Sequence, residues 1–252
     1  MRDLDIGKLS NSIQKWIREY VINAKADKVV VGLSGGIDSA VTAALSVKAI
    51  GKENVFGLLM PCESILSDID DAKLVVKSLD INYEVIDLTP VYQAFLRQLP
   101  NRGDSQKIAN ANLKARLRMA TLYFIAQSKG NCLVAGTGNR AEIAIGFFTK
   151  YGDGGVDFEP LGTLYKSEVR AVAKVLNIPD KIIKKVPSPG LWPGQTDEGE
   201  IGLSYDTIDE ILYRIDNNMD FNGLKREEID RVKYLMRISE HKLKVPPYYE
   251  VE

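Results

Sequence analysis

The residues best suited to chemistry lie near the amino-terminal end of the chain, in the run 34–39 of sequence SGGIDS. An apolar segment at 29–33 precedes this run, and a helix-like segment at 40–45 follows it. Two glycines allow the backbone to turn sharply and to approach a ligand closely. The free N–H groups of such a loop and the positive end of the helix dipole favour an anion. Strand, loop and helix together predict a phosphate-binding site.

Asp38 stands out in this loop, because a carboxylate repels phosphate unless a cation lies between them. We interpret Asp38 as a ligand of Mg²⁺, which binds through one or two carboxylates and the phosphates of its substrate. The loop contains no lysine, so it does not match the pattern G-x-x-x-x-G-K-[ST]. The pattern S-G-G-x-D-S resembles instead the pyrophosphate loop (PP-loop) of the ATP pyrophosphatases. These enzymes split ATP into AMP and pyrophosphate while they adenylate a substrate.

Two later segments carry charged side chains that we expect near the same ligand. Glu142 follows the run 136–139 of sequence GTGN, and a short helix there would direct it toward the loop. Asp38 and Glu142 would then supply two oxygen ligands to Mg²⁺. Arg116 and Arg118 lie on a helix-like segment. They are explained either by a solvent-exposed helix face or by a bidentate clamp on phosphate or carboxylate.

The segment 146–157 is rich in glycine, yet it also contains three aromatic residues, Lys150, Asp153 and Asp157. Glycine loses much conformational freedom on folding, so this many glycines indicate a tight backbone requirement. We expect Lys150 and Asp157 to bind a polar substrate and the aromatic rings to stack on a flat base.

Two further candidates lie nearer the carboxyl-terminal end. Lys166 opens a helix-like segment and, near a triphosphate, would neutralise charge on the leaving pyrophosphate. His241 is the only histidine. Together with Lys242 and Lys244 it forms a small basic cluster that could hold a substrate phosphate.

Strand-like and helix-like segments alternate along the chain. Strands are predicted at 28–33, 55–60, 82–86 and 131–135, and helices at 6–20, 68–79, 89–99, 105–127, 165–176, 205–215 and 225–242. This order predicts an α/β fold with a Rossmann-like parallel sheet and helices on both faces. A ligand then belongs at the carboxyl ends of the strands. A fifth strand cannot be placed, and residues 147–164 and 187–196 are predicted loops, the second a candidate lid.

Composition limits the classes of function. The chain has 252 residues, 45% of them hydrophobic, and a formal net charge of -1. We expect a single domain over 1–252 and no bulk attraction to nucleic acid or to a membrane. No apolar run of about 18 residues occurs and the first residues are charged, which predicts a cytoplasmic protein. Cys62 and Cys132 are far apart, and we expect ordinary buried thiols.

Taken together, these segments resemble ammonia-dependent NAD synthetase, a member of the PP-loop superfamily. The likeness rests on GLSGGIDS at 32–39, KARLRM at 114–119, GTGN at 136–139, FTKYGDG at 148–154 and QTDE at 195–198. It implies an adenine nucleotide alpha hydrolase-like fold, a homodimer, and the conversion of deamido-NAD⁺, ATP and ammonia into NAD⁺, AMP and pyrophosphate. Larger relatives add a glutaminase domain, for which this chain offers neither the length nor a candidate cysteine.

The resemblance also implies roles for individual residues. ATP would contact Gly32, Leu33, Ser34, Gly35, Gly36, Ile37, Asp38, Ser39, Met60, Thr137, Lys166 and Ser188. Deamido-NAD⁺ would contact Arg116, Arg118, Lys150, Asp157, His241 and Lys242. Mg²⁺ would be held by Asp38 and Glu142.

The implied chemistry needs activation of a carboxylate, which is a poor acceptor for ammonia. Its attack on the α-phosphate of ATP gives an acyl-adenylate, and ammonia then displaces AMP. The protein must gather anions, spread their charge and exclude water. Mg²⁺, Lys166 and the N–H groups of the loop would serve the first two tasks, and residues 187–196 are candidates for the third. A carboxylate should also bind ammonium and take its proton, and both Asp153 and Asp157 remain candidates.

Three alternatives share the phosphate loop. The subunit that aminates xanthosine monophosphate is one, but the segment 147–157 is not expected there. A tRNA-thiolating relative would need paired cysteines and a basic face. A non-catalytic adenine-nucleotide sensor would leave Glu142, Lys150 and Lys166 without a task.

Overall fold

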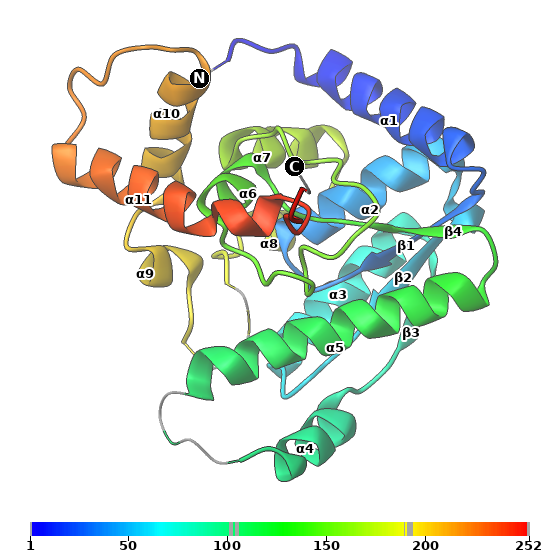
Figure 1. Cartoon of the computed structure of the whole chain (residues 1–252). Coiled ribbons are helices and arrows are strands. Elements are labelled where there is room, and N and C mark those ends of the chain that lie inside the picture. The colour runs from blue at the N-terminus through cyan, green and yellow to red at the C-terminus, as the bar shows by residue number, and fades with distance from the viewer. Residues whose placement is uncertain (1, 101–102, 104–105, 189, 191–193, 251–252) are drawn as a thin grey trace.

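The computed structural model describes residues 2–100, 103, 106–188, 190 and 194–250. Its centre is a four-stranded parallel sheet in the order β3-β2-β1-β4 (Figure 1). The strands are β1 (Lys28–Gly32), β2 (Val55–Leu59), β3 (Asn82–Val85) and β4 (Cys132–Ala135). Each lies within one residue of its predicted bounds, so the predicted α/β fold is confirmed.

The strand order places two loops side by side. β1 pairs with β2 on one edge and with β4 on the other, and Val31 is in register with both Gly57 and Ala135. The chain therefore leaves β1 and β4 at neighbouring points of the same sheet edge. In open parallel sheets, ligands bind where neighbouring strands connect in opposite directions. The loops after β1 and β4, at 33–36 and 136–139, occupy that position.

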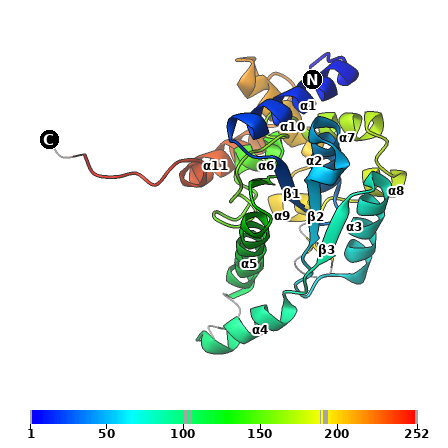
Figure 2. The ribbon, with the colours of Figure 1, turned by 90° about the vertical axis from the view of Figure 1, so that its right-hand side faces the viewer.

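Helices cover both faces of the sheet, as predicted (Figure 2). Alternate residues of β1 point to opposite sides. Val29 and Val31 belong to a core with α1 (Ile6–Asn23), α2 (Ile37–Ile50), α3 (Leu66–Leu79) and α7 (Lys166–Val175). Val30 belongs to a second core with α4 (Thr89–Gln98) and the long α5 (Gln106–Ser128). We call the first of these the sheet core.

A third core forms away from the sheet. It joins α6 (Arg140–Ile145), α10 (Tyr205–Asp216) and α11 (Arg226–Leu243) through buried residues such as Ile208, Leu212 and Val232 (Figure 1). We call it the C-terminal core. Three short helices were not predicted from the sequence: η1 (Lys52–Asn54), α8 (Asp180–Ile183) and α9 (Asp197–Ile201).

The predicted loop at 147–164 contains no helix or strand. One parallel bridge joins Phe158 to Ala135, and the Gly136 N–H donates to the Phe158 carbonyl at 2.8 Å. This short pairing takes the place beside β4 where a fifth strand would lie, and the sheet in the described residues has four strands. In the predicted lid at 187–196, residues 189 and 191–193 lie outside the described part of the chain.

Cys62 is a buried free thiol and Cys132 a partly buried one. Burial raises the pKa of Cys62, and it raises that of Cys132 to about 11, so neither thiol is ionised near neutrality. Among the helices that the structure describes, none combines the length and the apolar content needed to cross a bilayer.

Candidate active site

The phosphate loop has the geometry expected of an anion site. Gly35 has a φ of +78°, in the left-handed region that favours glycine. The Ser39 hydroxyl donates to the Gly36 carbonyl at 3.0 Å, and the Gly36 N–H donates to the Ser34 hydroxyl at 3.2 Å. α2 begins at Ile37 without a side-chain cap. Its first N–H groups thus lack a capping side chain, which suits an anion at this helix terminus.

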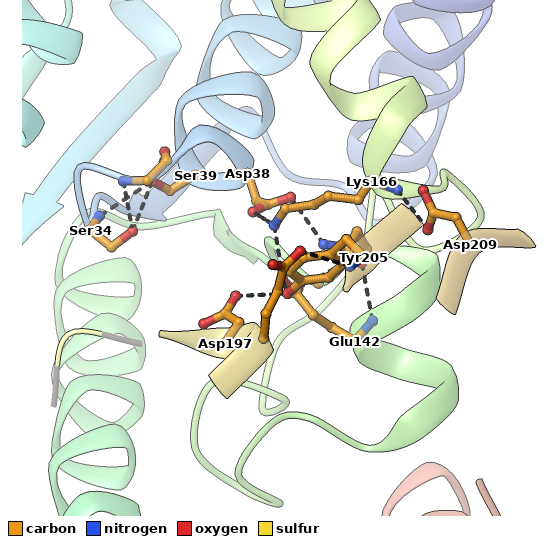
Figure 3. A network of polar contacts seen from close by, with 12 residues as sticks. Ser34, Asp38, Ser39, Glu142, Lys166, Asp197, Tyr205 and Asp209 are labelled. Carbon is orange, nitrogen blue, oxygen red and sulfur yellow. Dashed lines mark hydrogen bonds and ion pairs between the residues drawn. The ribbon is translucent and has the colours of Figure 1, made fainter. Parts of the chain in front are cut away.

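Three charged side chains from three helices meet beside this loop (Figure 3). The Lys166 ammonium lies 2.6 Å from Asp38 Oδ2 and 3.2 Å from Glu142 Oε1. Lys166 is 1% exposed, although it opens α7. Its burial opposes the charged form, but Asp38 and Glu142 raise the pKa of Lys166 above its ordinary value, so the side chain is a permanent cation.

Hydrogen bonds from Asn139 and to Asp209 hold the three charged side chains in place. The Asn139 amide donates to Asp38 Oδ1 at 3.1 Å, and Asn139 and Glu142 cap α6 reciprocally. Asp209 of α10 accepts the backbone N–H groups of Lys166 and Ser167 at 3.1 and 3.0 Å. An aspartate from another helix therefore caps α7 and fixes the start of the Lys166 side chain.

The hydrogen bonds of Tyr205 indicate the protonation state of two neighbouring carboxyl groups. Its hydroxyl lies 2.7 Å from Asp197 Oδ2 and 3.0 Å from Glu142 Oε1. A tyrosine hydroxyl has one hydrogen, so it donates to one carboxylate and accepts from the other when that one is protonated. Burial raises the pKa of both Glu142 and Asp197 above their ordinary values. The arrangement favours one retained proton in this acidic group.

These carboxylates fit a metal ion that arrives with a nucleotide. Asp38 and Glu142 converge on one cation, the Lys166 ammonium, so this point of the site already attracts positive charge. Among the described residues, no group of three or more His, Cys, Asp or Glu side chains is arranged to hold a metal. Mg²⁺ commonly takes one or two carboxylates together with substrate phosphates. Two carboxylates beside a phosphate loop match that donor set.

The cluster opens into a cavity of about 750 Å³ at the carboxyl end of the sheet. Most residues predicted to contact ATP line it: Gly32, Leu33, Ser34, Gly36, Ile37, Asp38, Ser39, Met60, Thr137, Lys166 and Ser188. Gly35 is not part of this lining, because it packs against α3. The volume is of the size that holds one or two small organic ligands.

The residues predicted to contact the dinucleotide do not all lie in one place. Arg116 donates to the Lys150 carbonyl at 3.4 Å, and Lys150 donates to the His241 carbonyl at 2.6 Å, so these three lie together at the end of α11. Lys242 donates to the carbonyls of Gly146 and Phe148 and lines the cavity.

Arg118 points elsewhere. It is partly buried, donates to the Met60 carbonyl at 3.1 Å and lines the cavity. Residues two apart on a helix face different directions. Arg116 and Arg118 therefore do not form a joint clamp.

The structure separates the two candidate bases for ammonium. Asp153 lines the cavity, accepts the Thr149 N–H at 2.9 Å, and has a pKa raised by burial. Asp157 is outside the cavity lining. It accepts the Val134 N–H at 2.7 Å and the Tyr123 hydroxyl at 3.0 Å, so both of its oxygens already have donors. Only Asp153 of this pair faces the space where substrates would meet.

Sequence reasoning missed Glu159, which lies behind the loop after β4. Its carboxylate accepts the Gly138 N–H at 2.9 Å. A Cβ at Gly136 would lie 2.3 Å from the Glu159 carboxyl carbon, so any larger residue at position 136 would displace the Glu159 side chain. Burial raises the pKa of Glu159 to about 8. No local pattern marks this residue, because it is an isolated glutamate within a predicted loop.

Replacing Glu159 with glutamine should stabilise the protein at alkaline pH. The unfolded glutamate loses its proton near pH 4.3 and the folded one near pH 8, so the free energy of unfolding of the parent falls as pH rises between these values. Glutamine removes this loss while keeping an acceptor for Gly138. We expect a gain on the order of 2 kcal/mol at pH 8.5 and little change at pH 4. Urea unfolding at both pH values tests this, with the exposed Glu227→Gln as control. Equal gains at both pH values would contradict it.

Comparison with known proteins identifies the relatives of this chain. A model of the NAD synthase family matches residues 9–246. An NH(3)-dependent NAD(+) synthetase of Methanosarcina acetivorans is 44% identical, over 98% of this chain and 100% of its own. Among solved structures, an NMN synthetase from Francisella tularensis has a TM-score of 0.89 at 36% identity, covering 99% of this chain and 100% of that one. An NH3-dependent NAD synthetase from Campylobacter jejuni has a TM-score of 0.84 at 35% identity, with 98% and 100% covered. This chain belongs to the NAD synthase family.

Proposed function

We propose that this protein converts deamido-NAD⁺, ATP and ammonia into NAD⁺, AMP and pyrophosphate. One observation carries the proposal: Lys166, Asp38 and Glu142 form a buried charged cluster beside a phosphate loop, in a chain that matches NH(3)-dependent NAD(+) synthetases over nearly its full length. Such a cluster suits attack on a phosphate more than passive nucleotide binding. A sensor would not need a buried lysine beside the triphosphate.

The residues support activation of a carboxylate by adenylation. The N–H groups at the start of α2 would bind phosphate oxygens, and Lys166 would offset negative charge as pyrophosphate leaves. The substrate carboxylate would attack the α-phosphorus, forming an acyl-adenylate and releasing pyrophosphate. Ammonia would then displace AMP.

Mg²⁺ fits this scheme as an ion held by Asp38, Glu142 and the nucleotide. When bound, it would neutralise phosphate charge and make pyrophosphate a better leaving group. We expect turnover to stop when Mg²⁺ is removed by a chelator.

Ammonia is mostly ammonium at neutral pH, so a base must take one of its protons. We propose Asp153, which lines the cavity and whose pKa lies above the ordinary value for aspartate, so that it is a better base. We further propose that the chain acts as a single synthetase domain on free ammonia and as a homodimer.

The function is tested by mass-spectrometric detection of NAD⁺ made from deamido-NAD⁺. Complete mixtures are compared with mixtures lacking ATP, ammonium or Mg²⁺, and with glutamine in place of ammonium. We expect NAD⁺, AMP and pyrophosphate in equal amounts with ammonium only. AMP formed without NAD⁺, or NAD⁺ formed without ATP, would contradict the proposal.

The Francisella tularensis structure favours a second candidate, amidation of nicotinic acid mononucleotide. This substrate presents the same pyridine carboxylate but lacks the adenylate half. We favour the dinucleotide because Arg116, Lys150 and His241 form an additional polar patch beyond the ATP cavity. The ratio of kcat/KM for the two substrates decides between them.

Replacing His241 with alanine should weaken binding of deamido-NAD⁺ by about tenfold and leave ATP affinity unchanged, since the His241 backbone accepts from Lys150 and His241 does not line the ATP cavity. Steady-state KM values for both substrates measure this. Arg226→Ala is the control, because Arg226 is exposed at the opposite end of α11 from His241 and pairs with Asp230. Equal loss for both substrates would indicate a folding defect instead.

A further inference from the structure

The Lys185 side chain contacts the phosphate loop from outside it. Its ammonium donates to the Gly35 carbonyl at 3.3 Å and to Asp68 Oδ1 and Asp71 Oδ2 at 2.7 Å each. The two aspartates lie on α3, and Lys185 follows α8 shortly before Ser188. Lys185 therefore connects three segments: the phosphate loop, α3, and the chain that leads to a predicted ATP contact.

The loop is packed directly on α3 at this point. A Cβ at Gly35 would lie 2.5 Å from the Asp68 carbonyl oxygen and 2.9 Å from Asp71 Cβ, so a side chain does not fit. The Asp71 side chain is 4% exposed and also pairs with Lys181 at 2.6 Å. A carboxylate this buried needs cationic partners, and two lysines supply them.

The contact with Gly35 fixes the direction of one peptide group. In a trans peptide the carbonyl and the following N–H point in opposite directions. The Gly35 carbonyl is held by Lys185, and the N–H of the same peptide, at Gly36, is held by the Ser34 hydroxyl. Between two glycines, rotation of a peptide meets little steric resistance. Without Lys185 the peptide could turn its carbonyl oxygen toward a bound phosphate, which would repel it.

Lys185 lines the cavity, so direct contact with phosphate is the alternative role. An ammonium has three donors. In this structure Gly35, Asp68 and Asp71 supply three acceptors for them. The geometry therefore favours a role in which Lys185 holds the loop in place, rather than a role in which it binds the nucleotide directly.

We propose that Lys185 is a positioning residue that orients the Gly35–Gly36 peptide for triphosphate binding and thereby sets the affinity for ATP. The inference rests on the proposed function, because it assumes that ATP occupies this loop. It adds a residue that acts through the loop backbone rather than by touching the nucleotide.

The chain offers a matched control in Lys181. Lys181 pairs with the same Asp71, but the donor to the Gly35 carbonyl is Lys185, and Lys181 does not line the cavity. We expect Lys185→Gln to weaken ATP binding by about tenfold and Lys181→Gln by less than about twofold. Isothermal titration with MgATP measures both, and titration with deamido-NAD⁺, expected unchanged, shows that each sample is folded.

The outcomes separate the inference from the function. If the parent protein binds ATP but the two variants bind it equally well, the positioning role is wrong. If the parent protein neither binds ATP nor makes NAD⁺, the proposed function itself is wrong. Should Lys185→Gln not fold, Lys185→Arg keeps a cation beside both carboxylates, but its planar group does not match three acceptors around one nitrogen. We then expect Lys185→Arg to bind ATP more weakly than Lys181→Gln, and equal binding would overturn the inference.

Discussion

Replacing Lys166 with methionine is expected to lower kcat by about a thousandfold while KM for ATP changes far less. The Lys166 ammonium lies beside Asp38 and Glu142 at the base of the phosphate loop. Charge builds up on the leaving pyrophosphate mainly in the transition state. A cation fixed in a water-poor site acts most strongly at that moment.

The same substitution should also destabilise the fold. Lys166 is 1% exposed, and its removal leaves two partly buried carboxylates without their cation. Breaking a buried pair in this way costs about 3–5 kcal/mol, reduced here because Asp38 and Glu142 retain some solvent contact. The kinetics must therefore be measured at a temperature below the midpoint of thermal unfolding of the variant. Lys174→Met, an exposed change on the same helix, is the control. A rise in KM without a fall in kcat would show that Lys166 binds the ground state and the transition state equally, which would contradict this role.

Replacing Asp38 with asparagine is expected to lower turnover by a factor of about a thousand or more. Asparagine keeps the shape of the side chain and one oxygen that Lys166 can donate to, but it loses the second acceptor oxygen, to which the Asn139 amide donates. It removes the charge that would hold Mg²⁺ against the nucleotide, and it leaves Glu142 as the remaining carboxylate on the Lys166 ammonium. We therefore expect a chemical defect in a folded protein.

Activity measured across a range of Mg²⁺ concentrations tests this expectation. The Asp38→Asn protein should need more Mg²⁺ and should not recover the parent rate at saturation. Asp70→Asn, an exposed change on α3, should behave like the parent. Near-normal turnover by the Asp38 variant would reject its role as a metal ligand.

Much of the candidate site could be predicted because its parts follow strand ends. Gly32 ends β1, and the run 34–39 leads directly into α2. Glu142 lies in a helix that starts five residues after β4. Parallel strands bring such segments to one edge, so local patterns were sufficient to place them.

The rest of the site depends on contacts between segments far apart in the sequence. Tyr205 lies 63 residues from Glu142, and Asp209 lies 43 residues from the Lys166 N–H that it caps. Periodicity places both on a helix but does not show which neighbour that helix meets. The same holds for Lys185, which is 150 residues from Gly35. Asp197 lies in the QTDE run, which is one of the segments that resemble the family. That resemblance did not assign a role to Asp197.

The side chains of the candidate site are positioned by helices of two separate hydrophobic cores. Asp38 and Lys166 stand on α2 and α7 of the sheet core, whereas Glu142 and Tyr205 stand on α6 and α10 of the C-terminal core. A displacement of about 1 Å between reacting groups can lower a rate by about a hundredfold. Evolutionary substitutions at the junction of the two cores should therefore show epistasis. A change that is neutral for folding in one core would be tolerated only with a compensating change in the other.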